Sequence, residues 1–185
     1  MLSKFLVVVL ALSTLAAAQQ TPAASTAAPT VSAVLDRQFA RIDREFVPMA
    51  KEMPEAKFNF APTNGEFKGV RTFAEQIKHV AGVSYRVSAA ILGEKSPVAP
   101  DAIAGAKSKD QIVKLVVDAF AYTHKAFASI TEKNLVEPIP SPFGSGGTTT
   151  RLDLAIALMA DQRDHYGQMV VYFRMNGMIP PASRR

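Results

Sequence analysis

The chain of 185 residues is 48% hydrophobic and 20% charged, a balance that suits one globular domain with its own core. It contains no cysteine, which excludes structural disulfides, a thiolate nucleophile, an iron–sulfur cluster and a lipid anchor on cysteine. The formal charge is +5, but lysines and arginines are spread among acidic residues, so we expect no nucleic-acid partner.

The first residues have the order of a signal peptide. Residues 1–18 contain a short basic start and an apolar run, and they end at Ala18 in an A-x-A cleavage site. The apolar run is short for a membrane-spanning helix. We therefore expect a secreted or periplasmic protein with no stable membrane anchor after cleavage. Residues 19–30 are rich in Ala, Thr, Pro and Ser, which predicts a flexible leader before a domain of residues 31–183.

Two helices are predicted in the first half of this domain. The first covers about residues 30–53, and its apolar residues repeat with helical spacing at Leu35, Phe39, Ile42, Phe46 and Met49. The second covers about residues 70–92 and ends at Gly93, with an inward stripe of Phe73, Ile77, Val80, Ser84, Val87 and Ile91. The loop of residues 54–69 between them carries Phe58 and Phe60, so we expect it to pack over one end of the core.

Two further helices are predicted in the second half. One covers about residues 109–132, with one stripe at Ile112, Leu115, Ala119, Tyr122 and Ala126 and a second at Val113, Val117, Phe120 and Phe127. The other begins near Thr149 or Thr150 and runs to Asn176. Proline- and glycine-rich loops precede both helices, and no segment has the pattern of a strand. The predicted fold class is therefore all-α, an antiparallel four-helix bundle.

The last helix carries two polar residues on its apolar stripe. Asp161 and His165 replace apolar residues in the series Leu154, Leu158, Asp161, His165, Met169 (or Gln168) and Tyr172. Residues four apart lie on one helical face, and burying such groups is costly unless they are paired or hold a metal. His79 lies in the middle of the second helix, on a face with the small residues Val83 and Ala90 that suits a cleft.

A bundle interior can bring His79 to Asp161 and His165. Two imidazoles and one carboxylate would suit a divalent transition metal such as Zn(II), Ni(II) or Fe(II) and would leave coordination positions open. The alternatives are a local ion pair between Asp161 and His165 and a surface role for His79. His124 is interpreted as a core or cleft-edge histidine. Gln162 and Gln168 are candidate hydrogen-bond partners of the ligands, with a surface position the alternative for Gln162.

These residues resemble those of a known family. The run from His165 to Ser183 resembles the C-terminal signature of the DinB-like superfamily, and the segment of residues 73–81 is similar to that family's first histidine motif. Residues 53–62 resemble the loop that precedes this motif in many members. The resemblance covers residues 31–183. It implies a four-helix bundle of up-down-down-up topology, often dimeric, so a homodimer is expected.

The resemblance also implies a divalent metal held by three histidines, one from the second helix and two from an H-x-x-x-H pair on the fourth. Carried over, His79 and His165 are two of the ligands, and the third position is Asp161, where the usual pattern has histidine. A carboxylate can still bind zinc, nickel or iron, and the departure is equally compatible with a weakened or lost site.

Two functions follow as hypotheses. Some relatives are thiol-dependent enzymes, such as bacillithiol transferases and mycothiol-dependent isomerases, but a cytosolic thiol cofactor suits an exported chain poorly. The first hypothesis is a metal-dependent thiol transferase or hydrolase, in which the metal lowers the pKa of a water or a substrate thiol on a small molecule. The second is a non-catalytic protein of the cell envelope that binds a metal or small ligand or acts as a dimeric interaction module.

Overall fold

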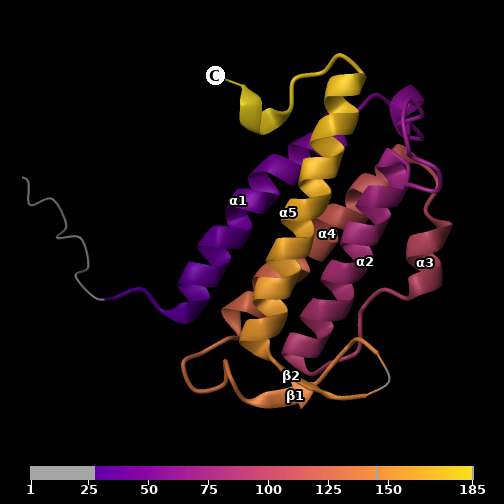
Figure 1. Cartoon of the computed structure of the whole chain (residues 1–185). Helices are drawn as coiled ribbons and strands as arrows, with labels where there is room; N and C mark the ends of the chain where they lie inside the picture. Colours follow the sequence, from indigo (N-terminus) through magenta and orange to yellow (C-terminus); the bar gives the residue numbers. More distant parts are fainter. Residues whose placement is uncertain (1–27, 145, 185) are drawn as a thin grey trace, which may run out of the picture.

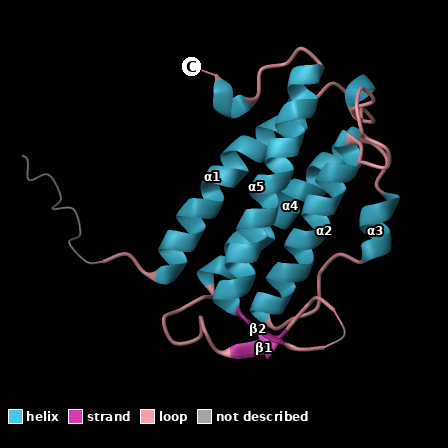
Figure 2. Ribbon diagram, viewed as in Figure 1, coloured by secondary structure: helices cyan, strands magenta, loops and turns pink. Residues whose placement is uncertain are grey.

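The computed structural model describes residues 28–144 and 146–184. The predicted signal peptide of residues 1–18 and the leader residues 19–27 lie outside the described residues, so export stays a prediction. Four long helices dominate the described part (Figures 1 and 2): α1 Val31–Glu52, α2 Phe73–Leu92, α4 Lys109–Ala128 and α5 Arg151–Met175. The shorter elements are η1 Glu55–Lys57, α3 Pro100–Gly105, β1 Pro138–Pro140, β2 Thr148–Thr150 and η2 Pro181–Ser183. Within the described ranges, no helix is both long and apolar enough to cross a membrane.

The four long helices form a bundle of up-down-down-up topology, which confirms the predicted all-α four-helix fold. Figure 1 shows α1 and α5 running in one direction and α2 and α4 in the other. The main neighbours of α2 are α4 and α5, and α1 packs against the same two helices. The helices α2 and α5 are therefore antiparallel neighbours along their length. The connection of residues 93–108 returns along the bundle from the end of α2 to the start of α4 and contains α3.

The predicted apolar stripes form the core. Every residue of the stripes predicted for α1 and α2 is buried. On α4 the prediction is less accurate, because Leu115 is only partly buried and Val116 takes the inward position. Phe39 joins α1 to α4 through edge-to-face contacts with Phe120 and Phe127, at ring-centroid distances of 5.0 and 5.4 Å. Such aromatic pairs add to the free energy gained from burial alone.

Side-chain caps fix where α2 and α4 begin. The Thr72 side chain accepts from the backbone N–H of Glu75, and the Glu75 side chain accepts from the backbone N–H of Thr72. Ser108 and Gln111 form the same reciprocal box at the start of α4. These caps satisfy backbone donors that the first helical turn leaves free. Gly93 ends α2 in the left-handed conformation, with a φ of 71°.

Replacing Gly93 with alanine is expected to lower the free energy of unfolding by about 1–2 kcal/mol, because an alanine Cβ is strained in the left-handed region. Gly105→Ala is the matched control, since Gly105 has helical backbone and a Cβ there would meet nothing within 4 Å. The control should leave stability unchanged or raise it slightly. Urea unfolding followed by circular dichroism measures both variants, and equal effects would contradict the cap assignment.

Two segments differ from the sequence prediction. The expectation that no strand forms was wrong, because β1 and β2 pair as an antiparallel hairpin in which Pro138 lies opposite Thr150. Three-residue strands are too short to show alternation, and the prolines of β1 argue against a strand except at an edge. The short helix α3 forms where a loop was expected, with Pro100 in its first turn, a position where proline is favoured.

The loop of residues 54–69 packs over one end of the bundle, as predicted. Phe58 is buried against Phe73 at the start of α2, with ring centroids 5.4 Å apart. Phe60 contacts Tyr172 near the end of α5 at 5.8 Å. The loop thereby ties the start of α2 to the end of α5, the two helices that carry the candidate site.

Candidate metal centre

Three side chains from α2 and α5 converge. His79 Nε2 lies 3.8 Å from Asp161 Oδ1, and His165 Nε2 lies 3.5 Å from the same oxygen. The two imidazole centroids are 4.6 Å apart. Each residue offers one ligand atom within 4.8 Å of those of the other two. The structure therefore brings together the three residues that were predicted as ligands.

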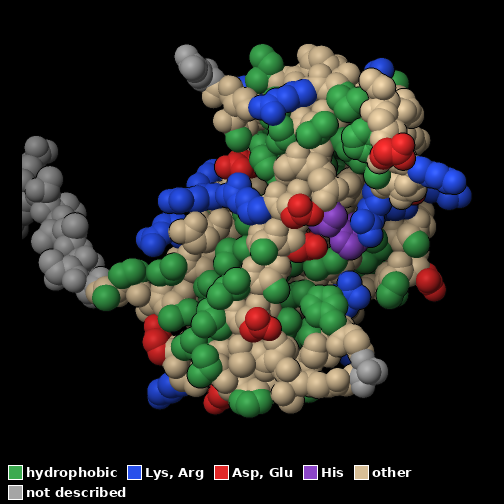
Figure 3. Space-filling view, in the orientation of Figure 1, with side chains coloured by type: hydrophobic (Ala, Val, Ile, Leu, Met, Phe, Trp, Pro, Cys, Tyr) green, Lys and Arg blue, Asp and Glu red, His purple; other side chains and the backbone are tan. Residues whose placement is uncertain are grey.

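Helix geometry explains this convergence. Asp161 and His165 lie one turn apart on the face of α5 that meets α2, and His79 projects from the middle of α2 toward them. The side chain of His165 is 8% exposed, whereas those of His79 and Asp161 are 28% and 31% exposed. Figure 3 shows histidine side chains reaching the surface beside acidic and basic side chains. The three residues thus form a partly open site at the surface of the bundle.

A chain of hydrogen bonds orients His165. Its Nδ1–H donates to Oε1 of the buried Gln76 at 2.7 Å. Gln76 Nε2 donates to Gln168 Oε1 at 2.8 Å, which leaves the amide oxygen of Gln76 facing the imidazole, and Gln168 Nε2 donates to Asp164 Oδ2 at 2.7 Å. When Nδ1 carries the proton of a neutral imidazole, Nε2 presents its lone pair. That lone pair lies on the side of Asp161, so two electron-rich atoms face each other.

Asp161 is held through its other oxygen. Gln162 Nε2 donates to Asp161 Oδ2 at 3.3 Å and lies 3.5 Å from Ser84 Oγ. Gln162 is fully buried, so the surface position considered for it was wrong. Its Oε1 has no hydrogen-bond partner among the described residues. These contacts engage Oδ2 and leave Oδ1 toward the two imidazoles.

The surroundings of His79 favour its neutral form. Burial lowers the pKa of His79, because the charged imidazolium loses hydration, and the nearby positive charge of Arg71 lowers it further. The carboxylate of Asp161 acts in the opposite direction and does not overcome these effects. A neutral imidazole is the form that binds metals.

The three residues fit a divalent transition metal. Histidine nitrogens and carboxylate oxygens lie roughly 2.0–2.2 Å from zinc, so two atoms on one ion can be up to about 4.3 Å apart. Both His–Asp distances, 3.8 and 3.5 Å, are within this limit. All three candidate ligand atoms lie within 4.8 Å of one another, so an inward movement of one imidazole by about 0.5 Å would bring the widest pair within the limit. An outer hydrogen bond from the second imidazole nitrogen, as His165 makes to Gln76, is the usual companion of a metal-ligating histidine.

A cleft adjoins the three side chains. A cavity of about 300 Å³ between α2 and α5 is lined by both His79 and Asp161 and is bounded by Phe143. A larger cavity of about 740 Å³ lies against α2 and α3, and the two share His79, Val83 and Arg86. The expectation that the face of His79, Val83 and Ala90 borders a cleft is confirmed.

His124 lies away from this site. It is half-buried between α1 and α4, where its Nδ1 lies 2.5 Å from Asp36 Oδ1 and its Nε2 lies 3.5 Å from Asp43 Oδ2.

Sequence reasoning missed Gln76 and Arg86. Both lie on α2 close to the face of His79, three residues before it and seven after it, so helical spacing from His79 is the signal that points to them.

Comparison with protein families matches residues 38–169 to the DinB superfamily, a span that includes all three converging side chains. The fold is similar to the crystal structure of a DinB-like protein from Bacillus subtilis, with a TM-score of 0.61 and 19% sequence identity. The match covers 78% of this chain and 92% of the other, and at this identity it shows the fold alone. No curated protein matches the chain.

Proposed function

Because the chain belongs to the DinB superfamily, we propose that it binds a divalent transition metal through His79, Asp161 and His165. Two imidazoles and one carboxylate suit Zn(II), Ni(II) or Fe(II) and leave coordination positions for a water or a substrate. The adjoining cleft gives a small molecule access to this side of the site. We further propose that the metal-loaded chain is an enzyme that acts on such a molecule.

The observation that carries the proposal is the hydrogen bond from His165 to Gln76. It places the proton of a neutral imidazole on Nδ1 and directs the Nε2 lone pair toward Asp161 Oδ1. The carboxylate oxygen and the lone pair repel each other unless a proton or a cation lies between them. The second imidazole, that of His79, offers a third acceptor at the same place. A cation removes the repulsion among all three atoms.

A bound divalent metal supplies Lewis acidity, which lowers the pKa of a water or a thiol and makes it a nucleophile near neutral pH. The chain itself orients the ligands through Gln76 and Gln162 and keeps one side of the site accessible from the cleft. Hydrolysis and thiol transfer both use a nucleophile of this kind.

Metal content is the first test. Purified chain, stripped with a chelator and titrated with Zn(II), Ni(II) or Fe(II), is expected to retain stoichiometric metal after gel filtration. Asp161→Ala should weaken binding by about tenfold or more, since it removes a ligand. Asp118→Ala is the matched control, because Asp118 is an aspartate in an exposed pair with Lys114 on α4. Absence of stoichiometric metal, or equal retention by both variants, would refute the site.

Turnover separates the enzyme from a non-catalytic binder. Metal-loaded chain is assayed on ester, amide and thiol-transfer substrates, and activity is expected to be lost on chelation and in His165→Ala. Stoichiometric metal without turnover on any of these substrate classes would favour the non-catalytic metal-binding alternative instead.

A further inference from the structure

The larger cavity is lined mostly by apolar side chains. Small residues on α2, namely Gly82, Ala89 and Ala90, leave the space open on one side. A Cβ added at Gly82 would lie 3.7 Å from Ile103 Cδ1 of α3, so a larger side chain would meet Ile103 and take up space between two residues that line the cavity. Val98 lines another part of the wall. A volume of about 740 Å³ suits a small organic molecule.

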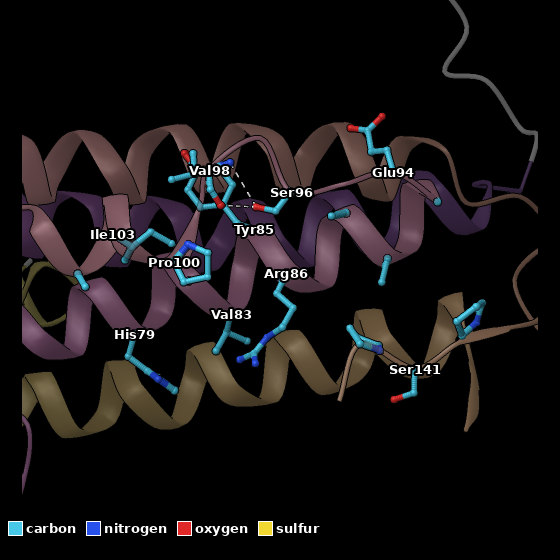
Figure 4. Close-up of a pocket in the computed structure, with 17 residues that line it drawn as sticks. His79, Val83, Tyr85, Arg86, Glu94, Ser96, Val98, Pro100, Ile103 and Ser141 are labelled. Carbon is cyan, nitrogen blue, oxygen red and sulfur yellow. Dashed lines mark hydrogen bonds between the residues drawn. The ribbon is translucent and has the colours of Figure 1, made fainter. Parts of the chain in front are cut away.

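Arg86 supplies the positive charge at the junction of the two cavities. It lines both of them, and Figure 4 shows its side chain extending from α2 on the same side as His79 and Val83. Its guanidinium carbon lies 4.8 Å from the ring centroid of Phe143. In the described part of the chain, no carboxylate lies within 4.0 Å of this guanidinium. Stacking on an aromatic face leaves the N–H groups at the guanidinium edge free to bind an anion.

The acidic side chain that lines the larger cavity is already engaged. Glu94 Oε1 accepts from Tyr122 Oη at 2.7 Å and from Lys125 Nζ at 3.3 Å. Its charge is therefore partnered outside the cavity, whereas that of Arg86 is not. The unbalanced charge of the larger cavity is consequently positive, and Figure 4 shows it on α2 between His79 and Glu94.

We propose that this cavity binds an apolar monocarboxylate, with the carboxylate on Arg86 and the apolar body between α2 and α3. A planar carboxylate matches the forked donors of a guanidinium, and one arginine balances one negative charge. Arg86 and His79 line the same two cavities. A role of this ligand as the substrate rests on the proposed metal function, whereas binding of the anion does not.

The test compares decanoate with decanol, which has the same chain without the charge. Isothermal titration of the metal-free protein is expected to show tighter binding of decanoate by about tenfold or more, the size expected for a hydrogen bond to a charged group. Arg86→Gln should remove this preference and leave decanol binding unchanged. Arg71→Gln is the control, because Arg71 also acts electrostatically on His79 but lines neither cavity. This control should keep the preference.

A second variant tests the cavity itself. Gly82→Leu should weaken the binding of decanoate and of decanol alike, since it fills the space rather than removing the charge.

Repeating the titration with zinc-loaded protein separates this inference from the proposed function. Decanoate that binds with the Arg86-dependent preference to a chain that retains no zinc would uphold the carboxylate site and refute the metal site. The inference would be overturned if decanoate does not bind or if decanoate and decanol bind equally well. It would also be overturned if the preference for decanoate needs zinc and survives Arg86→Gln.

Discussion

Zinc at one hundred times its dissociation constant is expected to raise the melting temperature of the chain by roughly 5–10 °C and to have no such effect on His165→Ala. A ligand at this excess stabilises the folded state by about 2.7 kcal/mol, and 1 kcal/mol shifts the melting temperature of a chain of this size by about 2–4 °C. Removing His165 takes away the most buried of the three ligands. Differential scanning calorimetry with and without zinc measures the shift.

For each variant, the test is the difference between the melting temperatures with and without zinc, and not the melting temperature itself. His165→Ala also deprives the buried Gln76 of its hydrogen-bond partner, so the metal-free variant is expected to melt earlier than the wild type. Asp161→Asn is a more conservative second variant, because it keeps the shape of the side chain and removes its charge. It should also reduce the zinc-induced shift. A shift of equal size in the wild type and both variants would place zinc elsewhere on the chain.

Phe120→Ala is expected to lower the free energy of unfolding by about 3–5 kcal/mol, the typical cost of removing a buried phenylalanine. Phe120 is 1% exposed on α4 and packs against Phe39 at 5.0 Å and Phe46 at 5.5 Å. Its loss would open a cavity between α1 and α4, on the far side of the bundle core from the metal ligands. Urea unfolding, analysed by linear extrapolation, gives the difference.

The matched control for this variant is Phe67→Ala. Phe67 lies in the loop before α2 and is 36% exposed, so its removal should change stability by well under half the effect at Phe120. Metal affinity of Phe120→Ala should stay close to that of the wild type wherever the variant is folded, because the ligands come from α2 and α5 alone. Comparable losses of stability for the two phenylalanines would contradict the assignment of the core.

Helical periodicity predicted most of this fold because each long helix buries one apolar face. The stripes of α1 and α2 are correct residue by residue. The hairpin of β1 and β2 could not be predicted, since prolines 138 and 140 remove backbone donors and three residues show no period. The burial of Val116 was not predicted, because two overlapping apolar stripes on α4 left undetermined which face of this helix points to the core.

The candidate ligands were predictable because polar residues on an apolar stripe are costly and therefore informative. Asp161 and His165 interrupt such a stripe, and His79 lies where an antiparallel neighbour meets it. The roles of Gln76 and Arg86 depend on partners far away in the sequence, His165 for the first and Phe143 for the second. Helical spacing from His79 points to both residues, but it does not show which residue of another element each one contacts.

Most of the burial that holds the bundle together comes from aromatic and aliphatic residues other than the candidate ligands. Phe39, Phe73 and Phe173 are fully buried, whereas the side chains of His79 and Asp161 are partly exposed. We therefore expect the chain to fold without a bound ion, unlike a zinc finger, which is unfolded without metal. If the site binds a metal as proposed, its occupancy would depend on the concentration of the ion and not on the folding of the chain. Different divalent ions could replace one another at this site as their concentrations change, without the chain unfolding between them.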